Sequence, residues 1–301
     1  MNMEAMPKTS LMPVSVVIPS LNPNESLLRL IESLELQSFE YGQIIIVDQS
    51  PSLQSQLLIA GYSGRLREKI EVLQSTPGLA KSRNAGIGAL RDGWEVVLVP
   101  DDDVRMDGDI SESIRNAVRE GSSAGSGRLC PENPNDRIRI DFPSSQVELT
   151  PRNVWRSSIE PCYFLTPGFI DKVGLYDESL GLGASSPWQS GEGTDLLLRG
   201  LKLGLSVAYV PGYALVEATR PPLSFAGNRR RLRKYARGTG RVFARNYSFI
   251  HQVLLIVRSL AKIVLQSTRG RKVFLENLEV LLGRFEGLTG SILWRNDGTR
   301  T

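Results

Sequence analysis

The sequence predicts an α/β protein in which a mostly parallel β-sheet is covered by helices on both faces. Over the first 125 residues, short apolar runs rich in Val and Ile alternate with longer segments of helical periodicity. Such runs are typical of strands buried on both faces, and the helical segments between them are typical of βαβ units. The 301 residues, of which 41% are hydrophobic and 23% charged, suffice for one large domain or two smaller ones with a substantial core.

The first part of the chain predicts four strands joined by helices. The expected strands are Val14–Ile18, Gln43–Val47, Lys69–Leu73 and Glu95–Val99, and the expected helices cover about residues 22–37, Leu53–Tyr62 and Leu79–Leu90. In the first helix we expect Asn22 as the N-cap, Pro23 as the first helical residue and Glu25 in the first turn. An all-helical protein is the alternative, and these short β-branched runs disfavour it.

The second part is less regular. Residues 127–155 are rich in Pro, Asn and Arg and predict a long excursion or irregular strands. Helical patterning returns at Gly168–Asp177 and Thr194–Gly204, and a strand follows at Leu205–Val210. We therefore expect one α/β domain over residues 11–225 and a helical extension over residues 226–301.

The extension differs sharply in charge from the rest. Residues 1–227 carry 20 Lys and Arg against 28 Asp and Glu, a net charge of −8, whereas residues 228–301 carry 16 against 4, a net charge of +12. A basic segment of this kind is attracted to polyanions. Arg229–Arg245 is either a binding surface for phosphates or a solvated helix. We expect no nucleic-acid partner, because neither an RNP motif nor a zinc finger is present.

Phe249–Leu265 combines apolar residues with Arg258 and Lys262 and is too short and too charged for a membrane-spanning helix. It fits an interfacial helix on an anionic leaflet, or a helix that packs on its own domain or on a second subunit in a homodimer. Both alternatives stay open.

Several classes of site are disfavoured by composition. The two cysteines, Cys130 and Cys162, are far apart, and His251 is the only histidine, so a structural or catalytic zinc site is not expected. No glycine-rich dinucleotide fingerprint or P-loop follows the first strand. The amino-terminal residues lack the apolar core of a secretory signal, so we expect a cytoplasmic protein.

Polar residues follow three of the predicted strands, at Pro19–Asn22, Asp48–Pro51 and Pro100–Asp103. The carboxyl ends of parallel strands meet at one edge of a sheet, where ligands bind in open α/β folds. Asp101 and Asp103 alternate along an extended exit, so they face one side, and their hard oxygen ligands suit Mg²⁺ or Mn²⁺ on a diphosphate. A solvated acidic turn is the alternative.

Three further polar residues belong to this edge. Asp48 is placed to accept hydrogen bonds from a base or a ribose, or else to cap the following helix. Lys81 and Arg83 open the helix after Gly78, where cations beside a helix N-terminus fit a pyrophosphate clamp, or are ordinary surface charges.

Six segments in order, VVIPSLN, IIIVDQS, GLAKSRNAG, VLVPDDD, VGLYDESLG and GEGTDLLLRGLKLG, resemble the motifs of family 2 glycosyltransferases, which have the GT-A fold. They span Val14–Gly204, about two thirds of the chain. The resemblance implies that Pro19, Ser20 and Asp48 line the pocket for base and ribose, that Arg83 and Asn84 approach ribose or phosphates, and that Asp101–Asp103 hold the metal. The residues predicted to bind the donor are Pro19, Ser20, Asn22, Asp48, Lys81, Arg83, Asn84, Asp101 and Asp102.

The chain departs from the family pattern twice. Where the family has a Glu-Asp pair, this chain has Glu192 and Gly193, so the aspartate usually assigned as the base is missing. We expect Glu192 to serve as the base, with Asp195 capping or positioning the helix, or serving as base in its place. The stretch Tyr213–Pro221 lacks the histidine that completes the metal shell in many relatives.

The missing histidine affects the predicted ligand set. Glu217 is the nearest oxygen ligand in that stretch, which makes Asp101, Asp103 and Glu217 the predicted metal ligands; otherwise the ion is held by the two aspartates, phosphate and water. Tyr235–Gly238 resembles a YxRG segment near the acceptor side of related transferases.

The resemblance thus implies a metal-dependent inverting glycosyltransferase. Its donor would be a UDP-, dTDP- or GDP-linked sugar, its cofactor Mg²⁺ or Mn²⁺, and its acceptor a hydroxyl of a glycan or lipid-linked glycan in surface polysaccharide synthesis, at the inner membrane face. Two alternatives remain open. One is a non-catalytic or weakly active nucleotide-sugar-binding homologue. The other is a sugar nucleotidylyltransferase, although Pro19–Pro23 lacks the glycine-rich phosphate loop that this class carries.

Overall fold

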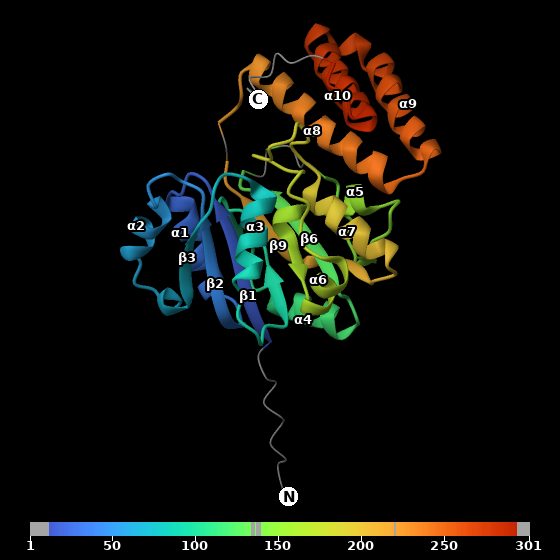
Figure 1. Cartoon of the computed structure of the whole chain (residues 1–301). Helices are drawn as coiled ribbons and strands as arrows, with labels where there is room; N and C mark the ends of the chain where they lie inside the picture. Colours follow the sequence, from blue (N-terminus) through green and yellow to red (C-terminus); the bar gives the residue numbers. More distant parts are fainter. Residues whose placement is uncertain (1–11, 134–135, 137–139, 220, 294–301) are drawn as a thin grey trace, which may run out of the picture.

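The computed structural model describes residues 12–133, 136, 140–219 and 221–293, and it confirms the predicted α/β class (Figure 1). The amino-terminal residues that were considered as a signal lie outside this part of the chain. Within it the strands form one nine-stranded sheet in the order β3-β2-β1-β4-β8-β6-β9-β5, with β7 paired to β9.

The elements follow one another as alternating strands and helices and then as helices alone. The strands are β1 (Pro13–Ser20), β2 (Glu40–Asp48), β3 (Ile70–Gln74), β4 (Val96–Leu98), β5 (Val104–Met106), β6 (Ala124–Pro131), β7 (Val147–Glu148), β8 (Tyr163–Leu165) and β9 (Val207–Glu217). The helices are α1 (Glu25–Glu35), α2 (Gln54–Ala60), α3 (Leu79–Gly88), α4 (Ser111–Arg119), α5 (Val154–Ser157), α6 (Pro167–Val173), α7 (Glu192–Lys202), α8 (Phe225–Asn246), α9 (Phe249–Leu265) and α10 (Arg271–Thr289), with 3₁₀ turns at Arg67–Lys69, Glu160–Cys162 and Ser267–Arg269.

Alternation along the buried strands builds two apolar cores, one on each face of the sheet. Val16 and Ile18 of β1 point to the face covered by α1 and α4, whereas Val17 points to the face covered by α3, α6 and α7. All of these valine and isoleucine side chains are fully buried. Burial on both faces explains why the strands appear in the sequence as unbroken apolar runs.

The sheet is parallel across β3, β2, β1 and β4 and mixed beyond β4. The next strand, β8, pairs antiparallel with β4, so the start of β8 lies beside the end of β4. The elements β5, β8 and α4 were not predicted, and the strands β5 and β8 are only three residues long and give little periodic signal.

The first helix begins later than expected. Its N-cap is Asn24, whose side chain accepts a hydrogen bond from the backbone amide of Ser26 at 2.8 Å, and the helix starts at Glu25. Asn22 and Pro23 therefore belong to the exit of β1 and not to the helix. The exit of β1 therefore runs from Leu21 to Pro23, at the edge where the polar residues gather.

The carboxyl-terminal helices form a separate layer above the sheet edge (Figure 1). Helices α8 and α10 pack closely through glycines: a Cβ atom on Gly240 would lie 2.2 Å from the carbonyl oxygen of Arg284, and one on Gly287 would lie 2.1 Å from that of Arg237. The helix α10 was not predicted individually, and the domain limits at residues 225 and 226 remain a prediction. In the described residues, every helix falls short of the length and hydropathy that crossing a bilayer requires.

Candidate active site

The exits of β1, β2 and β4 meet at one edge of the sheet, as the parallel pairing predicts. Ser20 of β1 pairs with Asp48 of β2, and the Ser20 hydroxyl donates a 2.5 Å hydrogen bond to the carboxylate of Asp102, which follows β4. The three aspartates are half-buried, and Pro19 is buried while Asn22 is exposed beyond it. The structure therefore gathers Ser20, Asp48 and Asp101–Asp103 into one place.

The Asp48 carboxylate holds the backbone around the end of β2. It is fully buried, and its two oxygens accept 2.7 Å hydrogen bonds from the amides of Ser50 and Ser55. Because Ser55 lies in the first turn of α2, Asp48 does cap this helix, which is one of the two roles considered for it. Its contact with a donor stays a prediction. The neighbouring Gln49 side chain accepts a hydrogen bond from the Gly78 amide and so fixes the start of α3.

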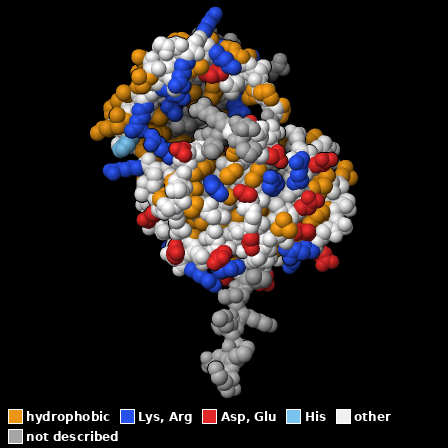
Figure 2. Space-filling model, turned by 180° about the vertical axis from the view of Figure 1, so that it is seen from behind, with side chains coloured by type: hydrophobic (Ala, Val, Ile, Leu, Met, Phe, Trp, Pro, Cys, Tyr) orange, Lys and Arg blue, Asp and Glu red, His pale blue; other side chains and the backbone are white. Residues whose placement is uncertain are grey.

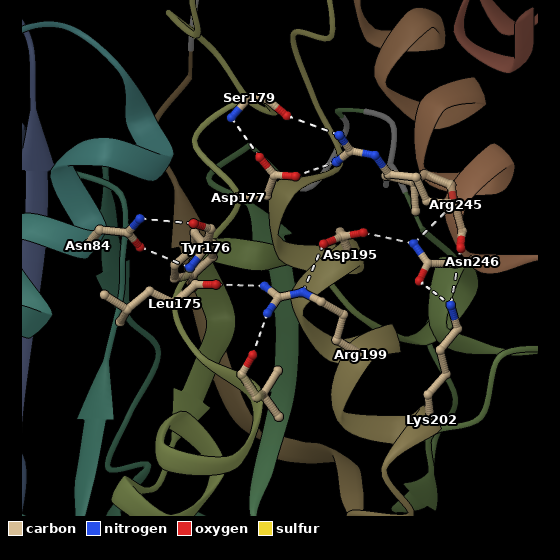
Figure 3. A network of polar contacts seen from close by, with 12 residues as sticks. Asn84, Leu175, Tyr176, Asp177, Ser179, Asp195, Arg199, Lys202, Arg245 and Asn246 are labelled. Atoms are coloured by element: carbon tan, nitrogen blue, oxygen red, sulfur yellow. Dashed lines mark hydrogen bonds and ion pairs between the residues drawn. The ribbon is translucent and has the colours of Figure 1, made fainter. Parts of the chain in front are cut away.

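Two residues of α3 lie away from the aspartates. Lys81 is exposed and its ammonium group donates to the hydroxyl of Thr76 at 2.7 Å. The Asn84 amide group donates to the carbonyl of Tyr176 at 2.9 Å and accepts from the amide of the same residue at 2.9 Å (Figure 3). Asn84 thus fixes the loop after α6, and the predicted contacts of both residues with a donor remain predictions.

Arg83 lies at the centre of the candidate site. Its side chain is completely buried, donates to Asp101 at 2.7 Å, forms an ion pair with Glu160 at 2.6 Å, and lies over the ring of Tyr176. Burial lowers the pKa of Arg83, but the charges of Glu160 and Asp101 outweigh that effect and raise it, so the guanidinium stays charged. Arg83 therefore links the aspartates to a second carboxylate and is not a surface charge.

Glu160 and Glu192 form a buried carboxyl pair on the far side of Arg83. Their side chains are hydrogen-bonded to each other, and Glu192 is the first residue of α7. Burial raises the pKa of both groups against the opposing effect of Arg83, and for Glu160 it does so well above the ordinary value. Three carboxyl groups, with Asp101, thus face one guanidinium, which is a local excess of negative charge.

Asp195, the second predicted catalytic residue, positions α7. Its carboxylate accepts hydrogen bonds from Arg199 at 3.0 Å and from Asn246 of α8 at 2.8 Å, while Arg199 also donates to the carbonyls of Val173 and Leu175 (Figure 3). These contacts tie α7, the loop after α6 and α8 together. They match the positioning role expected for Asp195 and leave its side chain engaged away from the aspartates.

Glu217 ends β9 beside the aspartates. Its backbone pairs with Val104, and the amide of Ala218 donates to the carbonyl of Asp103 at 2.9 Å. In the described residues, however, no three His, Cys, Asp or Glu side chains converge as a metal site, so Asp101, Asp103 and Glu217 do not form a ready-made cluster. Their oxygen chemistry fits Mg²⁺ or Mn²⁺ only together with oxygens from a bound diphosphate.

Glu160 was not predicted as a site residue. It lies outside the six motifs, in a 3₁₀ turn that precedes the short strand β8. Antiparallel pairing brings the start of β8 beside the end of β4, and this places Glu160 near Asp101. The available signal was indirect: Gly193 occupies the position of an expected aspartate, which calls for a carboxylate from elsewhere in the chain.

The model of the family described as Glycosyl transferase family 2 matches residues 15–164, about half of the chain. The succinoglycan biosynthesis protein ExoO of Rhizobium meliloti (strain 1021) is 30% identical over 112 residues, which are 37% of this chain and 30% of that protein. The match therefore spans less than a third of the relative.

Solved structures share the architecture. Residues 1–349 of S. aureus TarS, in complex with UDP-GlcNAc, superpose with a TM-score of 0.56 at 15% identity over 93% of both chains. GalNAc-T7 with UDP, GalNAc and Mn²⁺ gives a TM-score of 0.57 at 15% identity over 77% of this chain and 48% of that one. At this level of identity the likeness establishes the fold, which is the GT-A fold predicted from the motifs.

Proposed function

Because the chain belongs to glycosyl transferase family 2, we propose that it moves a sugar from a nucleoside-diphosphate donor to a hydroxyl of a glycan or lipid-linked glycan, with inversion at the anomeric carbon. The observation that carries the proposal is the continuous polar connection from Ser20 through Asp101–Asp103 and Arg83 to the Glu160–Glu192 pair. It supplies a donor edge and, next to it, carboxyl groups for the acceptor.

The nucleoside is proposed to lie over the exits of β1 and β2, and the diphosphate at Asp101–Asp103. A cavity of about 410 Å³ opens beside Glu217, and its lining carries the cations of Arg231 and Lys272 together with the carboxylates of Glu132, Asp136 and Glu217. The two cations are proposed to contact phosphate oxygens, and a divalent cation is then needed to offset the charge of the carboxylates. In the bound state a divalent cation, held by Asp101 and Asp103 with phosphate oxygens, would neutralise charge on the leaving group.

During the transfer, charge develops at two places, and each place needs its own protein groups. The departing nucleoside diphosphate gains negative charge, and the acceptor hydroxyl must lose a proton as it attacks the anomeric carbon. Cations near Glu217 serve the first need, and a carboxylate of the buried pair serves the second. Arg83 lies between the two regions and fixes their relative position, because it contacts both Asp101 and Glu160.

We propose that α9 rests on the anionic inner face of a membrane and so brings the site to a lipid-linked acceptor. Its exposed apolar side chains recur at helical spacing along one stripe: Phe249, Ile250, Val253, Leu254, Val257, Leu260, Val264 and Leu265. Arg258 and Lys262 are exposed on the same helix. Figure 2 shows hydrophobic and basic side chains together over the carboxyl-terminal helices, a combination that suits an anionic leaflet.

The transferase proposal is tested by turnover of a panel of UDP-, dTDP- and GDP-linked sugars, with Mn²⁺, with Mg²⁺ and with chelator. We expect hydrolysis or transfer with at least one donor, and a loss of at least about 100-fold in turnover on Asp103→Ala, since the leaving group loses its stabilisation. Asp107→Ala, which removes an exposed carboxylate four residues away, is the matched control and should leave turnover unchanged. Donor binding without turnover by the wild-type chain would favour the non-catalytic homologue.

The membrane proposal is tested by flotation with vesicles of anionic phospholipid. Replacing Ile250 and Val264 together by Glu should abolish co-flotation, because both side chains are about 70% exposed on the apolar stripe. Leu57→Glu changes an equally exposed leucine on α2 and should have no effect. The wild-type chain could instead fail to float with vesicles and elute as a dimer that the double variant disrupts. That result would assign the apolar stripe to contact with a second subunit.

A further inference from the structure

Position 193 is a glycine where the family pattern has an aspartate, and the space beside it is already filled. A Cβ atom on Gly193 would lie 2.7 Å from Cδ and 2.8 Å from Cγ of Glu160, and 2.9 Å from the ring of Tyr163. These distances are far below ordinary carbon–carbon contacts. We propose that Glu160, from the turn before β8, replaces the missing aspartate as the carboxylate that removes the proton from the acceptor hydroxyl. The inference rests on the transferase function proposed above.

Local contacts hold the Glu160 carboxylate at this place. The backbone amide of Gly193 donates a hydrogen bond to it, so the group sits at the positive N-terminal end of α7. Arg83 pairs with it at 2.6 Å and reaches Asp101 at 2.7 Å with the other terminal nitrogen. Glu160 is therefore one guanidinium away from the carboxylates assigned to the donor diphosphate, which is where an attacking hydroxyl has to be activated.

Glu160 is less enclosed than Glu192, although its Oε1 atom, which faces Arg83, is buried. Its side chain keeps 17% of its surface exposed, whereas Glu192 is 3% exposed as a residue. Glu192 is enclosed on one side by Gly181, where an added Cβ atom would lie 2.7 Å from the Glu192 carboxyl carbon. Glu192 hydrogen-bonds Glu160 and orients it, so we assign Glu192 as a positioning residue and not as the base that the sequence analysis expected.

The proposed step is balanced. The acceptor O–H proton passes to the Glu160 carboxylate while the acceptor oxygen forms a bond to the anomeric carbon. The bond from that carbon to the donor phosphate oxygen breaks at the same time, and the nucleoside diphosphate leaves with the electron pair. Product release and loss of the proton to water return Glu160 to its ionised form.

The first test is Glu160→Gln, which keeps the shape and removes the charge. We expect kcat for transfer to fall by about 10²–10⁴-fold, with the KM for the donor changed less than threefold, since general-base catalysis contributes that much and acts on the acceptor. A Glu160→Gln variant that keeps kcat within threefold of wild type overturns the assignment. A wild-type chain that turns over no nucleotide sugar overturns the proposed function itself.

The second test relocates the carboxylate. Gly193→Asp alone should be inactive or unstable, because its side chain overlaps Glu160, and Glu160→Ala alone should be as slow as Glu160→Gln. In the double variant Glu160→Ala/Gly193→Asp, the aspartate enters the vacated space, and we expect kcat to recover at least tenfold over Glu160→Ala. A merely structural role for Glu160 predicts no such recovery. A double variant that melts near the wild-type temperature, binds donor and stays as slow as Glu160→Ala overturns the proposal.

Discussion

Two clusters of buried arginine and glutamate in the described residues use the same side chains to opposite effect. The cluster at the sheet edge has Arg83 between Asp101, Glu160 and Glu192, so carboxyl groups outnumber the cation. Burial raises the pKa of both glutamates there, although Arg83 opposes it. The carboxylates of this cluster repel one another, and this repulsion favours the binding of protons or cations.

The cluster between α8 and α10 has the reverse balance. Glu286 is fully buried and accepts hydrogen bonds from Arg233 and Arg237 at 2.6 Å each, with Arg237 only 1% exposed. Burial raises the pKa of Glu286, but the bonds from the two arginines outweigh that effect and leave the pKa below its ordinary value. Glu279 of α10 also pairs with Arg229 and Arg233, so this cluster has three arginines for two carboxylates. Glu286 therefore stays ionised and joins the two helices.

Charge balance, and not burial alone, decides whether the pKa of a buried carboxyl group is raised or lowered. The pKa of a carboxyl group surrounded by hydrogen-bond donors is lowered, so the group stays ionised. The pKa of a buried carboxyl group that shares a single cation with other carboxyl groups is raised, so the group binds a proton more readily. Some arginines of the basic extension therefore pair with glutamates inside the protein and do not face a ligand.

Glu286→Gln should lower the free energy of unfolding by about 3–5 kcal/mol, because it removes the buried negative charge that pairs with Arg233 and Arg237. Turnover per folded molecule should stay near wild type, since Glu286 lies outside the candidate site. Urea denaturation and a transferase assay measure the two effects. Glu276→Gln, on the same helix, removes a carboxylate that accepts from the Asn228 amide and serves as the control. A loss of less than about 1 kcal/mol would contradict the contrast.

Glu192→Gln should give the opposite pattern. The free energy of unfolding should be unchanged or slightly higher, because one of three competing carboxyl groups loses its charge. Turnover should fall about tenfold, equivalent to about 1.4 kcal/mol, since the amide orients Glu160 less well. Donor calorimetry together with kcat separates this effect from weakened donor binding. A strongly destabilised Glu192→Gln protein would show that the sheet-edge cluster is structural after all.

The pH dependence of these two effects should differ in sign. Glu192 and Glu286 both have an ordinary pKa of about 4.5. The lowered pKa of Glu286 means that its stabilisation is complete above 4.5 and is lost as the pH falls through the lower folded value. The raised pKa of Glu192 means that its ionisation costs stability as the pH rises above 4.5. The stability gain of Glu192→Gln over wild type should therefore grow as the pH rises from 5 to 7.5. A gain that shrinks over this range would reverse the assigned direction.

Much of the α/β body could be predicted, because its strands are long and buried on both faces. The strands β1, β2 and β3 and the helices α3 and α9 lie where the periodicity put them, and α9 has the predicted limits. The start of α1 was wrong by two residues, since Asn22 and Asn24 are equally good caps and only the path of the β1 exit distinguishes them.

The candidate site could be predicted only in part. Ser20, Asp48 and Asp101–Asp103 were expected at one edge because they follow parallel strands, and the structure brings them together. The buried position of Arg83 was not expected, since a Lys-x-Arg pair at a helix start is compatible with the surface. Glu160 was missed because its proximity to Asp101 depends on antiparallel pairing of a three-residue strand.

By itself, the sequence determined the strand–helix alternation, the order of the six motifs and the family, because these depend on local periodicity and on residues close together in the chain. Tertiary structure decided which carboxylate lies beside Gly193 and which arginines remain for a ligand. Both outcomes depend on contacts between residues 18 to 77 positions apart. Charges so separated acquire a common environment only when the chain folds and burial makes their balance matter.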